Sequence, residues 1–288
     1  MSPELLSTLW TQSSVFTLRD FFEFQKASSP HEVEEIAGDS KIGRFLRENP
    51  EWWEQGGRTL DWCAKQKARV TFPGEPDYPE PLYDLEYPPL FVSYFGSPCW
   101  ATGRRLSVVG SREPSRNTLE WMDRELTPLI EKDVLLVSGG ARGVDQKAHT
   151  LCVRARRPTA VFLPSGLGRM YPADFVRWLE PILDAGGAVL SELAPFEEMK
   201  KHYFLKRNRM IAAMSPVVLI AEARRQSGTM ITARLAMEMD RLLAAVPGPV
   251  DDPRWAGNLE LLSSGSNLIR DYWDLGVLMD LKSNSSFS

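Results

Sequence analysis

The sequence predicts an α/β protein with a doubly wound, mostly parallel sheet, preceded by a small helical domain. After residue 105, short apolar runs recur and end 26 to 30 positions apart, with segments of helical spacing between them. The runs are continuously apolar rather than alternating, which is typical of parallel strands buried on both faces. Only six or seven strands fit, so a (β/α)₈ barrel is disfavoured. The predicted strands are 106–109, 134–137, 159–163, 188–190, 217–220 and 243–246.

The first third of the chain is predicted to form short helices. Ser29-Pro30 offers a cap and an early proline, and residues 38–40 reset the pattern before a second helix at 42–48. A third helix starts near Trp52, and we expect Gly56-Gly57 to interrupt it. Seven prolines between 73 and 98 exclude a long helix there, so we expect an ordered connector with one strand at 90–94. We expect a helical, acidic domain at 1–68, a domain with the parallel sheet at 69–281, and a disordered tail at 282–288.

The charge of the chain is divided unevenly between these parts. The formal net charge is −4, from 34 Lys and Arg against 38 Asp and Glu. Residues 1–100 hold 9 basic and 16 acidic residues, a net charge of −7, which leaves 25 and 22, or +3, for residues 101–288. Such asymmetry indicates two domains with different partners. The net charge of the whole chain, which argues against a nucleic-acid partner, is therefore misleading.

Composition also limits the setting of the protein. No apolar run reaches the roughly 18 residues of a membrane-spanning helix, and the first 22 residues lack a signal-peptide pattern. Cys63, Cys99 and Cys152 lie too far apart to indicate a disulfide framework or a metal site. We therefore expect a cytoplasmic protein without membrane partner, metal or cofactor.

Small and basic residues directly follow several predicted strands. In a parallel sheet, ligands bind beyond the carboxyl ends of the strands. Gly110-Ser111-Arg112 follows the first strand and Ser138-Gly139-Gly140 the second, while Ser227-Gly228-Thr229 opens a later helix. Glycine lets the backbone approach a ligand, and a helix N-terminus favours an anion. We therefore expect a phosphate-binding edge, although glycine is also common in such turns without any ligand.

The strongest basic cluster is the segment 200–209, with five cations, no acid, and the aromatic residues Tyr203 and Phe204. Cations that neutralise phosphates, interleaved with rings that stack on bases, are typical of proteins that bind single strands. We interpret the segment as a basic loop that places Arg207 and Arg209 at the sheet edge. A solvated loop without a ligand is the alternative, and Phe204 is equally compatible with core packing.

Signatures of common enzymes are missing. The sequence contains no G-x-G-x-x-G, no G-x-x-x-x-G-K-[ST] and no G-x-S-x-G motif. His149 follows the second glycine turn within a predicted helix, where packing or hydrogen bonding is the expected role. We therefore expect a binding protein and not an enzyme.

With these residues assembled, the chain resembles the DprA/Smf family of bacterial DNA-processing proteins. The resemblance runs from about residue 77 to residue 269, and eight motifs fall in order. They are 108–112, 138–145 with His149, 166–172, 191–192, 207–209, 227–233, 246–248 and 267–269. Many members carry a C-terminal winged-helix domain; only residues 271–288 follow the last motif, so we expect that domain's function to be absent.

The resemblance implies an extended Rossmann fold that dimerises, binds single-stranded DNA in a basic pocket and hands it to a RecA-type recombinase during natural transformation. The implied DNA-binding residues are Ser111, Arg112, Gly139, Gly140, Phe204, Lys206, Arg207, Asn208, Arg209, Ser227, Gly228 and Thr229.

Two other functions stay open. The chain is also similar to the related phosphoribohydrolases, but these need a Pro-Gly-Gly-x-Gly-Thr-x-x-Glu turn, and here no glutamate follows Ser227 before Glu238. The third possibility is a sensor of a small nucleotide in the same pocket.

Overall fold

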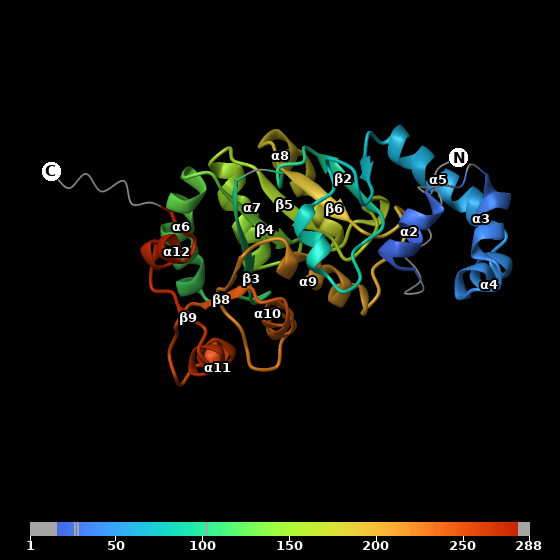
Figure 1. Cartoon of the computed structure of the whole chain (residues 1–288). Helices are drawn as coiled ribbons and strands as arrows, with labels where there is room; N and C mark the ends of the chain where they lie inside the picture. Colours follow the sequence, from blue (N-terminus) through green and yellow to red (C-terminus); the bar gives the residue numbers. More distant parts are fainter. Residues whose placement is uncertain (1–15, 26, 28, 102, 282–288) are drawn as a thin grey trace.

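A computed structural model describes residues 16–25, 27, 29–101 and 103–281. The predicted tail, 282–288, lies outside the described residues. In the described part, a mixed sheet forms the centre of the molecule, with the N-terminal helices at one end and α11 and α12 at the other (Figure 1).

The sheet has the order β1-β2-β6-β5-β4-β3-β7-β8-β9. Strands β3 to β9 pair in parallel. At one edge of the sheet, β2 pairs antiparallel with β6 and with β1. The chain moves outward from β3 to β6 and then returns to the other side of β3, so the direction reverses between β3 and β7. The bounds are β1 (Arg69–Thr71), β2 (Val92–Gly96), β3 (Arg104–Val109), β4 (Val134–Gly139), β5 (Thr159–Phe162), β6 (Ala188–Ser191), β7 (Val217–Ile220), β8 (Leu242–Ala245) and β9 (Asn267–Leu268).

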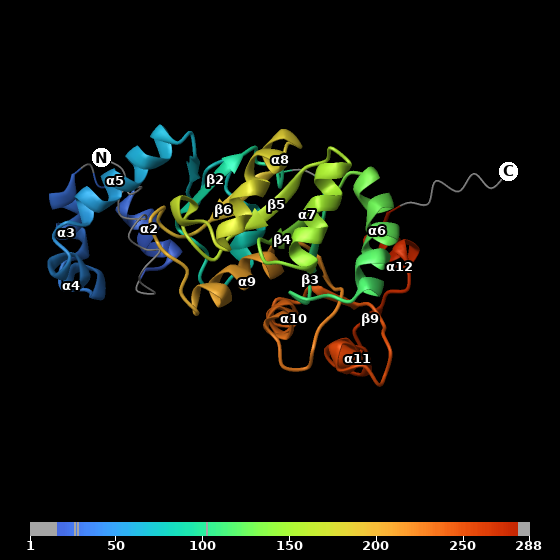
Figure 2. The same cartoon turned by 180° about the vertical axis from the view of Figure 1, so that it is seen from behind.

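Helices cover both faces of this sheet, as the doubly wound prediction requires. One face packs against α6 (Arg116–Glu131), α7 (Val144–Arg154) and α12 (Tyr272–Leu278), around residues such as Leu106 and Leu136. Figure 2 shows α6 and α7 in front of the strands, with α8 (Leu179–Asp184) beside them. The other face packs against α9 (Tyr203–Ala213), α10 (Gly228–Glu238) and α11 (Ala256–Ser263), around residues such as Val137 and Ile220. The predicted α/β fold class is confirmed.

The N-terminal helices have their own core, which continues onto the connector through Phe72, Leu90 and Phe91. They are α2 (Leu18–Phe24), α3 (Pro30–Ala37), α4 (Lys41–Glu48) and α5 (Trp52–Lys65). Ser29 caps α3 through its side chain, as the sequence pattern indicated, and Ser40 caps α4 in the same way.

One helix prediction is wrong, because α5 runs unbroken through Gly56 and Gly57 to Lys65. Gly56 is buried, so the packing of this helix outweighs the cost of about 1 kcal/mol that each glycine adds in a helix.

The connector and the number of strands also differ from expectation. The strand predicted at 90–94 is shifted to Val92–Gly96. The described residues form nine strands rather than six or seven, because β1 and β9 have only three and two residues and show no apolar run of their own. Within the described residues, no helix is both long and apolar enough to cross a membrane.

Candidate functional site

A cavity of about 450 Å³ opens at the carboxyl ends of β3 and β7, where the direction of the sheet reverses. Ligands of open α/β sheets bind at this position. Eight of the twelve candidate DNA-binding residues line it: Ser111, Arg112, Phe204, Arg207, Asn208, Ser227, Gly228 and Thr229. The structure therefore brings together residues that lie more than 100 positions apart in the sequence.

A neighbouring cavity of about 710 Å³ shares Arg112, Phe204 and Arg207 with the first and continues past Arg142 and Tyr171. We call the two together the joined cavities. Arg112, Arg207 and Glu113 line both cavities. Arg224 and Asp145 line the first cavity as well, and Arg142 and Asp174 line the second, so each has three arginines and two acids. Both therefore carry one excess positive charge, which favours an anionic ligand.

Phe204 stands at the centre of a cluster of rings and cations. The guanidinium carbon of Arg112 lies 5.0 Å from its ring centroid, and that of Arg207 lies 6.0 Å away. Tyr171 meets the same ring edge-to-face, with 5.9 Å between the centroids. The ring is half-buried and lines both cavities, so part of it remains open to a ligand.

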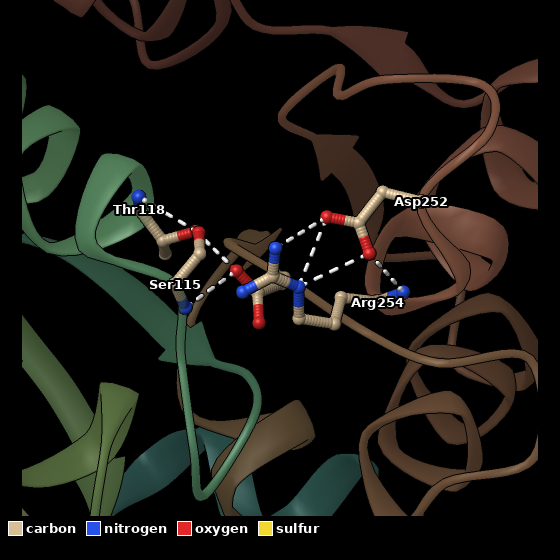
Figure 3. Close-up of polar contacts among 5 residues, drawn as sticks. Ser115, Thr118, Asp252 and Arg254 are labelled. Carbon is tan, nitrogen blue, oxygen red and sulfur yellow. Dashed lines mark hydrogen bonds and ion pairs between the residues drawn. The ribbon is translucent and has the colours of Figure 1, made fainter.

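The turn that carries Arg112 is held from the β7 side. The backbone N–H of Ser111 donates to the carbonyl of Glu222 at 2.8 Å. The buried carboxylate of Glu222 accepts bonds from the Ser115 N–H, at 2.9 Å, and from the Thr118 hydroxyl, at 2.5 Å. Ser115 also caps α6 by accepting from the Thr118 N–H (Figure 3). Both ends of the turn are thus fixed, whereas Arg112 itself is exposed.

The α7 side of the turn depends on a glycine. The Val144 N–H donates to the Ser111 carbonyl at 3.1 Å. Gly143 has φ +82°, and a Cβ there would lie 2.4 Å from the same carbonyl oxygen, so a side chain is excluded twice over.

Arg207 is buried beneath the site and pairs with Asp145, with 3.2 Å between Nη1 and Oδ2. A Cβ on Gly139 would lie only 1.3 Å from this Nη1, so the glycine makes room for the guanidinium. Burial raises the pKa of the Asp145 carboxyl, against the opposing effect of Arg207. Gly139 does not line the cavity itself, but it makes room for Arg207 and Asp145, which do.

His149 also contacts Gly139, through the backbone carbonyl, and is not a candidate acid or base. Its Nε2 lies 2.9 Å from the Gly139 carbonyl and its Nδ1 2.8 Å from the Thr159 hydroxyl. Burial lowers the pKa of the imidazole to about 4. The ring is therefore neutral at pH 7 and holds the end of β4.

The interpretation of the basic cluster as a loop is wrong, because Tyr203 to Arg209 form the first turns of α9. With 3.6 residues per turn, Phe204, Arg207 and Asn208 share one face. Lys206 and Arg209 line a different cavity of about 520 Å³. Arg209 there binds the carboxylate of Glu192 and the carbonyl of Tyr87.

Of the remaining candidate residues, Ser227 lies at the cavity and Gly140 does not. Ser227 caps α10 by accepting from the Met230 N–H, which places the positive end of that helix at the cavity. Gly140 instead packs against Leu163 and Phe175, where a Cβ would lie 2.8 Å and 3.0 Å from their side chains.

Sequence reasoning missed four residues of this region as candidates: Arg142, Tyr171, Glu222 and Arg224. Arg142 and Glu222 lie within three residues of the ends of β4 and β7, so the rule that ligands bind beyond strand ends could have included them. Among the described residues, no group of three or more His, Cys, Asp or Glu side chains could hold a metal ion.

The fold and the site define a Rossmann-like α/β protein with an arginine-lined cavity at the switch point of its sheet. The model of the family described as DNA recombination-mediator protein A matches residues 69–279. The chain belongs to this family, which confirms the resemblance to DprA/Smf proteins.

Individual relatives extend this result. The chain is 27% identical to the DNA processing protein DprA of Bacillus subtilis, over 93% of this chain and 88% of that protein. It is 32% identical to the Smf protein of Synechocystis, over 73% of this chain, and spans about half (54%) of that relative's length.

Two solved structures share the fold. DprA of Streptococcus pneumoniae superimposes with a TM-score of 0.82 at 25% identity, covering 98% of this chain and 100% of the other. DNA processing protein A of Helicobacter pylori gives 0.65 at 26% identity, covering 74% and 97%; it was described for its single-stranded DNA binding mode.

Proposed function

We propose that this protein binds single-stranded DNA in the joined cavities and does so without catalysing a reaction on it. The observation that carries the proposal is the shared wall of Arg112, Phe204 and Arg207, which combines cations with an open aromatic ring. Arginines neutralise phosphates and the ring stacks on a base, whereas the bases of a duplex are already stacked and paired. The Helicobacter pylori relative supports the same ligand.

The test is fluorescence anisotropy with a labelled oligothymidylate and with a duplex of equal length. Tight binding of the single strand and weak binding of the duplex is the expected result. Arg112→Ala should weaken binding of the single strand at least tenfold, since a cation that contacts phosphate or stacks on a base is lost. Arg116→Ala is the matched control: it lies four residues away, is exposed, pairs with Glu120 and does not line either cavity. Equal affinity for duplex and single strand would refute the proposal.

We further propose that the protein acts in the cytoplasm as a homodimer that delivers the strand to a RecA-type recombinase during natural transformation. Family membership supports this step. The test measures the DNA-dependent ATPase of a RecA-type recombinase on a strand covered by single-strand-binding protein. The protein should shorten the lag before ATP hydrolysis, and Arg112→Ala should not. Light scattering after gel filtration tests the dimer.

A further inference from the structure

The last turn of α5 joins the N-terminal helices to the sheet. Cys63 and Ala68 are buried in the same core as Leu163 and Phe175, which come from the sheet and its loops. Trp62 packs, partly buried, against this core and is not among the residues that line the joined cavities. Its side chain therefore belongs to the link between the helices and the sheet and not to the wall of the proposed DNA site.

Trp62 contacts two loops at once. Its ring meets that of Phe196 edge-to-face, with 5.8 Å between the centroids. It also lies against Gly168, where an added Cβ would be 3.1 Å from Cζ2 of the indole. Gly168 belongs to the loop after β5, and Phe196 belongs to the loop after β6. The indole therefore covers the place where these two loops meet.

The two loops are also bonded to each other. The backbone N–H of Gly166 donates to the carbonyl of Glu197, and that of Gly168 donates to the carbonyl of Pro195, both at 2.9 Å. A Cβ on Gly166 would lie 2.0 Å from the carbonyl oxygen of Ala194, so the loops approach as closely as glycine allows. A shift of one loop therefore moves the other.

Each loop leads to one of the rings of the proposed DNA site. Tyr171 lies on the loop after β5, and its N–H donates to the Ser165 hydroxyl at 3.0 Å. On the other loop, Glu197 accepts a bond at 2.9 Å from the hydroxyl of Tyr203, the first residue of α9 and the neighbour of Phe204. Tyr171 and Phe204 meet edge-to-face and line the second of the joined cavities. The placement of both rings thus depends on the two loops.

We propose that Trp62 is a positioning residue for DNA binding: it holds the two loops together and so keeps the rings of Tyr171 and Phe204 at the spacing that accepts a base. The inference rests on the proposed function, since both rings belong to that site. It gives the N-terminal helices a part in DNA binding without a contact to DNA. Rings that are held in place before the ligand arrives bind it at a lower entropic cost.

The test is fluorescence anisotropy of the full chain with the labelled oligothymidylate. Trp62→Ala should weaken binding about fivefold, within the range for residues that act on a site through their neighbours. Trp62→Phe should keep most of the affinity, because a ring remains between the loops. The slope of log K against log salt should not change, because no cation is lost. In a variant that already carries Tyr171→Leu and Phe204→Leu, Trp62→Ala should weaken binding little further.

Trp53→Ala is the matched control. Trp53 lies on the same helix, is also half-buried, and packs against Trp52 in the separate core of the N-terminal helices. Its loss should lower the melting temperature without changing the affinity at a temperature where circular dichroism shows the chain folded. Should Trp62→Ala fail to fold, Phe196→Ala removes the other ring of the contact from an exposed position and should also weaken binding.

Unchanged affinity in Trp62→Ala and Phe196→Ala would overturn the inference. An equal loss in Trp53→Ala, or an undiminished loss in the variant without the two rings, would overturn it as well. Arg112→Ala separates this failure from that of the proposed function. If Arg112→Ala weakens binding and Trp62→Ala does not, only the positioning role is wrong; if neither does, the proposed DNA site is wrong and the inference with it.

Discussion

The buried carboxylate of Glu222 and the backbone N–H of Ser115 are 2.9 Å apart, and this bond closes the turn that presents Arg112. The Ser111 N–H donates to the carbonyl of the same glutamate. Glu222, two residues beyond the end of β7, therefore fixes both ends of the turn. Arg112 thereby projects from a rigid support, although its own side chain is exposed. Preorganisation of this kind lowers the entropic cost of holding a ligand.

Glu222→Ala should destabilise the protein and weaken DNA binding together. It leaves the buried Ser115 N–H without its acceptor, at a cost of about 1–3 kcal/mol. The Thr118 hydroxyl also loses its bond to Glu222 but can still donate to Ser115 Oγ, 2.9 Å away. Glu222→Gln keeps an acceptor oxygen and should lose less stability and less affinity for DNA. Urea denaturation and anisotropy measure the two effects. In an Arg112→Ala background, Glu222→Ala should weaken DNA binding little further; an undiminished additional loss would show that Glu222 does not act through Arg112.

Gly139→Ala should disrupt the buried pair of Arg207 and Asp145. The added Cβ would lie 1.3 Å from Nη1 of Arg207 and 2.7 Å from Oδ2 of Asp145, so the guanidinium must move from its partner. Breaking a buried ion pair costs about 3–5 kcal/mol, and the affinity for the single strand should fall with it.

Gly57→Ala is the control for that substitution. Nothing lies within 4 Å of its added Cβ, and Gly57 is inside α5. It should stabilise the protein by about 0.5–1 kcal/mol, because alanine is the better helix former. Thermal unfolding compares the two variants, and similar melting temperatures would contradict the role of Gly139.

Phe204→Leu should separate stacking from charge. Loss of the ring removes about 1–3 kcal/mol of stacking per base, so the affinity for the single strand should fall about tenfold. The slope of log K against log salt should stay unchanged, because no cation is lost. Arg112→Ala should instead reduce that slope by about 0.7 if it contacts one phosphate. A salt slope that changes with Phe204→Leu would argue against stacking.

His149 should make stability depend on pH. Its folded pKa is about 4, below the ordinary value of 6.5, so the unfolded chain takes up the proton first as the pH falls. Stability from this residue is complete above pH 6.5 and is lost between pH 6.5 and 4, by up to about 1.4 kcal/mol per pH unit. His149→Gln should flatten this part of the profile in urea denaturation. Identical profiles for His149→Gln and the parent would exclude this source.

The six longer parallel strands could be predicted because burial on both faces requires continuous apolar runs, as in Val217–Ile220. The edge strands β1 and β9 could not, since they have only three and two residues and no apolar run of their own. Arg112 and Ser227 were predictable from their position after a strand or before a helix. It could not be predicted that Lys206 and Arg209 face a different cavity from Arg207, because this separation depends on the helix α9, and we expected a loop in that segment.

Photo-crosslinking with an oligonucleotide that contains 4-thiothymidine, followed by mass spectrometry of the peptides, tests whether single-stranded DNA lies in the joined cavities. The crosslinks should fall on the peptides that carry Phe204 and Tyr171, whose rings line the cavities. They should disappear in Arg112→Ala and persist in Arg116→Ala. Crosslinks confined to peptides that do not line either cavity would contradict the account.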